Sequence, residues 1–181
     1  MKILPILCLA ILLFVSCKKE GNTEFSITKD QVGKVTRTTL IKDLETIYAD
    51  DSLVRKDPNT ELGTSTSKIE IFQKGGDLLL SITPNTDSLQ TIENIRIYDP
   101  RFSTAEGINL LSTFKDIKTH YTIKKVLTSM NNVVILLKES DLYFTISKEE
   151  LPAELRFGST NIDAVQIPDE AAIKYMMIGW E

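Results

Sequence analysis

The side chains best suited to acid–base chemistry in this chain are its carboxylates and its one histidine, His120. A catalytic histidine needs an activated nucleophile and an orienting acid beside it. The sequence contains no Gly-x-Ser-x-Gly motif that would supply the nucleophile. We therefore interpret His120 as a surface or half-buried helix position.

Paired carboxylates are a second kind of catalytic centre, because glycoside hydrolysis needs only two of them at a set separation. The candidates considered are Asp99, Glu106, Asp116, Glu149 and Glu150. With 25 acidic residues in the chain, however, some pair fits by chance. No catalytic residue is assigned on this basis.

Metal and phosphate sites have weaker support. Asp50 and Asp51 lack the Asp-x-Asp-x-Asp-Gly spacing that wraps calcium, and a solvated helix end explains them. Gly75 and Gly76 read as a hairpin turn, since neither Lys-Ser/Thr nor a helix follows them. The sequence therefore predicts neither a metal site nor a cofactor.

Three neighbouring residues are candidates for contact with a partner protein. Tyr98, Arg101 and Phe102 flank Pro100 in the connection between the two halves of the chain, and tyrosine and arginine are enriched at binding hot spots. The competing interpretation is that Phe102 packs between the halves while Arg101 is merely exposed. The sequence leaves both open.

The N-terminus has the organisation of a secretory signal peptide over residues 1–16. Lys2 precedes an apolar run over residues 3–15, which is too short to span a bilayer as a mature helix. The run ends Phe14-Val15-Ser16-Cys17, which resembles the lipobox of bacterial lipoproteins. The resemblance implies that Cys17 is diacylglycerol-modified and begins the mature chain. The alternative is an ordinary signal peptide followed by a chance cysteine.

Residues 17–24 would then be the lipidated cysteine and a polar tether to the membrane. Lys18 stands where inner-membrane lipoproteins usually carry Asp, so by resemblance the anchor lies in the outer membrane, on the periplasmic side or the cell surface. The rest of the mature chain, residues 25–181, has the length of one domain. A formal net charge of −4 without basic clusters argues against binding to nucleic acid.

An internal repeat organises that domain. The stretch 39–48 returns as the stretch 112–121, with Lys, Asp, Thr and Tyr at the same spacing in both. Both copies carry an apolar stripe that predicts a short helix, capped by Thr39 in the first and Ser112 in the second. Repetition at a fixed spacing indicates one structural unit used twice, over residues 25–101 and 102–181.

Segments that alternate apolar and polar residues follow each predicted helix and indicate about four strands per unit. Short connections make most of them antiparallel. The segment 133–138 reads as an apolar strand that is buried on both faces if it is central in the sheet. Capping boxes predict brief helical turns at residues 27–32 and 146–151. The predicted fold is α+β, with one antiparallel sheet of about eight strands and both helices on one face. Two separate four-stranded sheets are the alternative.

The stretch Phe102-x-Thr104-x-x-Gly107-Ile108 before a Ser-Thr-capped helix resembles uncharacterised bacterial lipoproteins with tandem αβ units. It is also distantly similar to the β-lactamase-inhibitor-like and SmpA/OmlA-like small lipoproteins. The resemblance implies a binding module and not an enzyme. We therefore expect a lipid-anchored binding or assembly-support module with an envelope protein as partner; the alternative is an envelope hydrolase that uses carboxylates.

Overall fold

The computed structural model describes residues 23–57, 67–86, 90–157 and 161–180. The predicted signal peptide, Cys17 and the tether as far as residue 22 lie outside these residues. No helix of the described part is both long enough and apolar enough to cross a lipid bilayer.

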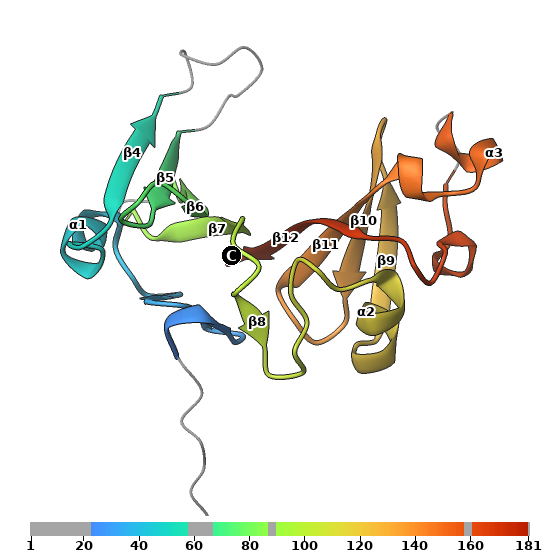
Figure 1. Cartoon of the computed structure of the whole chain (residues 1–181), viewed down its shortest axis with the longest axis horizontal. Helices are drawn as coiled ribbons and strands as arrows, with labels where there is room; N and C mark the ends of the chain where they lie inside the picture. The colour runs from blue at the N-terminus through green and yellow to red at the C-terminus, as the bar shows by residue number, and fades with distance from the viewer. Residues whose placement is uncertain (1–22, 58–66, 87–89, 158–160, 181) are drawn as a thin grey trace, which may run out of the picture.

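The largest element is an antiparallel sheet of eight strands in the order β4-β5-β6-β7-β12-β11-β10-β9 (Figure 1). Its strands are β4 (Ser52–Lys56), β5 (Lys68–Phe72), β6 (Leu78–Pro84), β7 (Ile92–Ile97), β9 (Ile123–Thr128), β10 (Asn132–Leu137), β11 (Leu142–Ser147) and β12 (Ile173–Gly179). The predicted α+β class and the single antiparallel sheet of eight strands are confirmed. The alternative of two separate four-stranded sheets is wrong, because β7 pairs with β12 at the centre.

A second sheet of four short strands, in the order β3-β2-β1-β8, was not predicted. It consists of β1 (Ser26–Ile27), β2 (Gln31–Val32), β3 (Val35–Thr36) and β8 (Ser103–Thr104). The helical turn expected at residues 27–32 is wrong, because Ile27 pairs with Val32 across a tight hairpin. The Thr28 backbone N–H donates to the Gln31 carbonyl at 2.8 Å and closes that turn.

Few residues are helical. The helical elements are η1 (Thr23–Phe25), η2 (Ile41–Asp43), α1 (Leu44–Ile47), α2 (Phe114–His120), η3 (Lys148–Glu150), α3 (Ala153–Arg156) and η4 (Ala164–Gln166). The turn predicted at residues 146–151 is confirmed as η3, where the Ser147 hydroxyl accepts the Glu149 N–H.

Both predicted helix caps are displaced by one residue. Leu40 occupies the N-cap position of the first helical stretch without a side-chain hydrogen bond, and the Thr39 hydroxyl accepts the backbone N–H of Thr36 instead. The second begins after Thr113, which forms a capping box with Asp116. Ser112 is occupied before the helix, where its hydroxyl accepts the Asn109 N–H.

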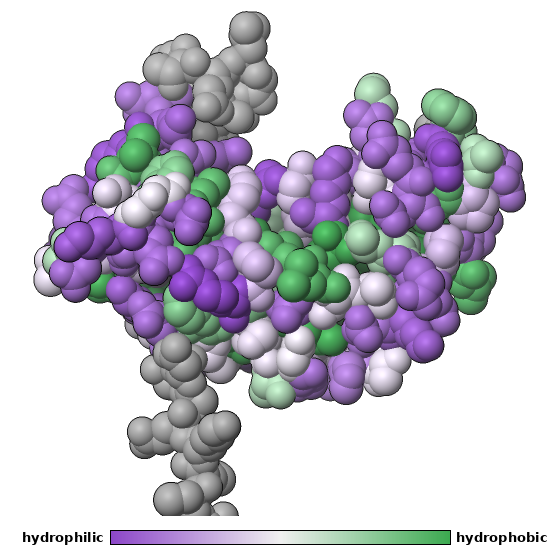
Figure 2. Space-filling model, in the orientation of Figure 1, coloured by the Kyte–Doolittle hydropathy of each residue, from purple (hydrophilic) through white to green (hydrophobic). Residues whose placement is uncertain are grey.

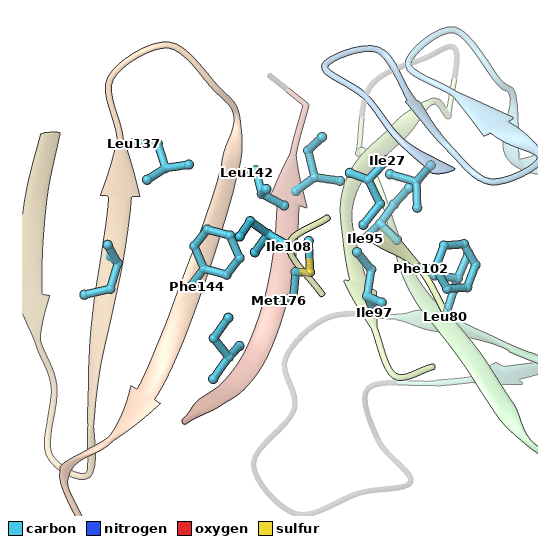
Figure 3. Packing of buried hydrophobic residues seen from close by; sticks show 14 of the residues in the cluster. Ile27, Leu80, Ile95, Ile97, Phe102, Ile108, Leu137, Leu142, Phe144 and Met176 are labelled. Carbon is cyan, nitrogen blue, oxygen red and sulfur yellow. The ribbon is translucent and has the colours of Figure 1, made fainter. Parts of the chain in front are cut away.

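Most of the core lies on one face of the large sheet, where Figure 3 shows Leu80, Ile95, Phe144 and Met176. Strands β6 and β11 also have buried residues on the other face, namely Leu79, Ser81 and Thr145. Helices α1 and α2 and the four-stranded sheet supply further members of the same cluster, among them Leu44, Phe114, Ile117, Ile27 and Val32. Burial alternates along β10, which lies second from the edge of the sheet, so residues 133–138 are not the central strand that would be buried on both faces.

Candidate functional site

The connection between β7 and β8 carries the three residues predicted to contact a partner. The Tyr98 backbone N–H donates to the Leu79 carbonyl at 2.9 Å, which fixes the start of the connection beside β6. Arg101 is exposed, whereas Phe102 is buried and its ring meets Phe25 edge-on at 5.1 Å. Phe102 therefore supports the surface from beneath, and the side chains that face outward are those of Tyr98 and Arg101.

Arg101 is held from three sides. Its Nε donates to both Asp99 carboxylate oxygens at 3.0 Å, and its terminal nitrogen donates to the Gln73 side-chain oxygen. Its guanidinium also lies 4.2 Å from the centre of the Phe25 ring. Hydrogen bonds from Arg101 lower the pKa of the buried Asp99 carboxyl, so the pair is ionised at neutral pH.

Two shallow hollows lie on either side of Arg101. One, of about 640 Å³, is lined by Tyr98, Asp99 and Pro100 together with residues of the β5–β6 turn such as Lys74 and Asp77. The other, of about 700 Å³, is lined by residues of β1 and β8. The arginine therefore forms a fixed ridge between the two hollows, with 45% of its side chain still exposed.

A neighbouring arginine extends this surface and was missed by sequence reasoning. The Arg96 guanidinium carbon lies 3.4 Å from the Tyr175 ring centre and 4.9 Å from the Tyr98 ring centre. Alternation along β7 puts Arg96 and Tyr98 on one face, but nothing local in the sequence places Tyr175 beside them. Such stacking fixes both cation and rings, which gives a rigid polar–aromatic surface.

The residues considered for catalysis lie in ordinary structural roles. His120 ends α2 and is exposed beside a hollow of about 250 Å³. Its neighbour Tyr121 donates its O–H to Glu106 at 2.5 Å, which lowers the pKa of that carboxyl. Burial raises the pKa of Tyr121 to about 12.

The remaining carboxylates show no acid–base pair. The backbone N–H of Thr113 lowers the pKa of Asp116, and the Glu150 carboxylate accepts the Ala172 N–H at 3.3 Å. A general acid needs a raised pKa, whereas the shifts of Asp99, Glu106 and Asp116 are all downward. Within the described residues, no group of three or more His, Cys, Asp or Glu side chains could hold a metal ion.

Comparison with known proteins gives the fold and no family. No protein-family model matches the chain, and no curated protein matches it. The chain is similar to the crystal structure of the uncharacterized protein yfeY from Escherichia coli, with a TM-score of 0.51 and 15% sequence identity. The alignment covers 86% of this chain and 99% of that chain. At this identity the likeness indicates a shared fold alone.

Proposed function

We propose that this chain is a lipid-anchored binding module of the outer envelope that works by contact with a protein partner. The observation that carries the proposal is the ridge of Arg101, which is fixed by Asp99, Gln73 and Phe25 and is still substantially exposed. Fixing a long side chain before binding reduces the entropy lost on association. The stacked Arg96 and Tyr98 add further side chains that lose little freedom on contact.

The anchor is the second part of this proposal, and it rests on the sequence of residues 14–17. Acylation of Cys17 would hold the domain close to the outer membrane, where tethering raises the effective concentration for a neighbouring protein. Mass spectrometry of the mature N-terminus tests this part. We expect a chain that begins at acylated Cys17, and an unmodified chain that begins elsewhere would reject it.

We further propose that residues 25–101 and 102–181 are two copies of one unit within a single domain. The sheet order supports this, because β4 to β7 and β9 to β12 run inward from opposite edges and their last strands pair. Bridges at matching places add support: Leu40 pairs with Thr91 before β7, and Thr113 pairs with Ala172 before β12. In an experimental structure, residues 39–99 should superpose on residues 112–180, and unrelated strand paths would reject the repeat.

The contact surface is tested by recovery of a partner from outer membranes with the acylated protein as bait. We expect one partner to be retained by the wild type and lost with Lys74→Glu combined with Arg101→Glu. Lys42→Glu combined with Lys115→Glu is the matched control, since it changes charge equally at two exposed residues that line neither hollow beside Arg101. If both double variants lost the partner equally, the contact would lie elsewhere. If both retained it equally, the surface around Arg101 would be rejected as the contact.

A further inference from the structure

A separate hollow lies where the β9–β10 turn meets η3, α3 and the start of β12. Its volume is about 1030 Å³, near the upper end of the range for pockets that hold small ligands. In Figure 1 this end of the molecule, marked by α3, lies on the side opposite the blue N-terminal segment. The hollow shares no residue with the two hollows beside Arg101.

Positive charge dominates the lining. Lys148, Arg156 and Lys174 face one carboxylate, Glu149, although the whole chain carries a formal charge of −4. Lys148 is only 3% exposed and already has an interaction within the fold, so the cations open to a ligand are Arg156 and Lys174.

The two outer cations are positioned by hydrogen bonds. The Arg156 Nε donates to the Leu151 carbonyl at 2.8 Å, and the Lys174 Nζ donates to the Asn132 side-chain oxygen at 3.1 Å. Guanidinium has five N–H donors and ammonium three, so each bond uses one donor of its group.

Apolar side chains stand beside these cations. Met130 and Phe157 line the same hollow and are 85% and 86% exposed. Figure 2 shows hydrophobic residues at this end of the molecule next to strongly hydrophilic ones. Single exposed apolar residues are ordinary. Here, however, two of them lie beside cationic side chains, so the hollow offers contacts for both the apolar chain and the anionic group of an amphiphile.

We propose that this hollow binds a small organic anion that joins a carboxylate or phosphate group to an apolar chain. The anionic group meets Arg156 and Lys174, and the apolar part lies against Met130 and Phe157. Both a free acid and a lipid headgroup have this chemistry, and the experiment distinguishes them. The inference does not depend on the anchor or on the Arg101 ridge.

The test is calorimetric titration of the mature domain with dodecanoate below its micelle concentration. We expect binding that weakens as salt rises, because exposed charges are screened. Dodecyltrimethylammonium, with the same chain and the opposite charge, should not bind, and inorganic phosphate should bind more weakly than dodecanoate. Sedimentation with phosphatidylglycerol vesicles distinguishes a lipid headgroup from a free acid as the ligand. If the protein sediments with the vesicles, the ligand is a lipid headgroup; if it stays in solution, the ligand is a free anion.

Variants assign the binding to this hollow. Arg156→Glu with Lys174→Glu should weaken dodecanoate binding by about tenfold or more, since each reversal replaces attraction by repulsion. Phe157→Ser with Met130→Ser should also weaken it, whereas Leu111→Ser, at an exposed apolar site elsewhere, should not. Lys42→Glu with Lys115→Glu is the charge control. Unchanged binding in the Arg156/Lys174 variant, or equal binding of the cationic amphiphile, would overturn the proposal.

Discussion

The tyrosines that end the two copies of the repeated stretch have opposite surroundings. Tyr121 donates its O–H to Glu106, whereas the Tyr48 hydroxyl is buried without a hydrogen-bond partner among the described residues. Burial raises the pKa of Tyr48, so the phenol stays protonated and its lost hydration is uncompensated. The Tyr121 hydroxyl therefore stabilises its half of the fold, whereas the Tyr48 hydroxyl costs free energy although its ring packs in the core.

We expect Tyr48→Phe to raise the free energy of unfolding by about 1 kcal/mol, because it removes a buried donor that has no acceptor. Tyr121→Phe should lower it by about the same amount, because it breaks the hydrogen bond to Glu106. Urea denaturation of both variants measures the difference. A loss of stability in Tyr48→Phe would mean that its hydroxyl has a partner in solution.

The Asp99–Arg101 pair makes stability depend on pH. Since the folded pKa of Asp99 lies below its unfolded value of about 3.9, the pair contributes fully above that pH and its contribution is lost as pH falls through the folded pKa. Arg101→Met should lower the free energy of unfolding at pH 7 by about 1–3 kcal/mol, because the buried carboxylate loses donors.

Denaturation between pH 7 and pH 3 tests this sign. The difference in the free energy of unfolding between wild type and Arg101→Met should become smaller as the pH falls and Asp99 becomes protonated in both proteins. Arg55→Met is the control, since its ion pair with Glu45 is exposed on both sides and should contribute less than about 1 kcal/mol at any pH. If this difference in unfolding free energy stayed constant with pH, the lost stability would come from packing of the aliphatic part of Arg101 and not from its ion pair with Asp99.

At the scale of elements, the local patterns were the ones that sequence reasoning recovered. Period two located the strands of the large sheet, and Gly75 and Gly76 adopt the positive φ of +118° and +110° that their hairpin turn requires. The second helix was found, but its cap was misplaced by one residue. Neighbouring Ser and Thr are both good caps, and only the contact between Thr113 and Asp116 decides between them.

Thr113→Ala should therefore lower the free energy of unfolding by about 1 kcal/mol. The Thr113 N–H and hydroxyl both donate to Asp116, at 2.8 Å and 3.0 Å, so a double-mutant cycle with Asp116→Ala should be non-additive. Thr39→Ala serves as the comparison, because that hydroxyl lies outside its helix. Additive losses in the cycle would mean that the cap does not act as a unit.

At the scale of the whole molecule, the elements that sequence reasoning missed are those that depend on distant pairing. The four-stranded sheet exists because β1 pairs in parallel with β8, so that Ser26 of the first half meets Ser103 of the second. Arg96 and Tyr175 also belong to different halves, and the β7–β12 pair brings them together. Residue type indicated Tyr98, Arg101 and Phe102, but it could not show that Phe102 is buried against Phe25 or that Arg96 stacks on Tyr175.

Trp180 reports on how firmly the two halves are joined. The one tryptophan of the chain is buried, and its indole N–H donates to the Lys29 carbonyl at 3.0 Å, so it links the end of β12 to the β1–β2 turn. Its backbone N–H also donates to the carbonyl of Glu93 in β7 at 2.7 Å. Both contacts cross from the second half to the first, and the core cluster is continuous across them.

We therefore expect the mature domain to unfold in a single cooperative transition. Trp180 fluorescence and far-ultraviolet circular dichroism should give the same midpoint in guanidinium chloride, because the β7–β12 pair and the shared core leave neither half an independent interior. Ile178→Ala, which opens a cavity at that pair, should shift both curves together by about 2–5 kcal/mol of unfolding free energy. If fluorescence instead changed at a lower denaturant concentration than dichroism, the halves would be separate folding units, and the repeated stretch would mark two subdomains that share one sheet only when docked.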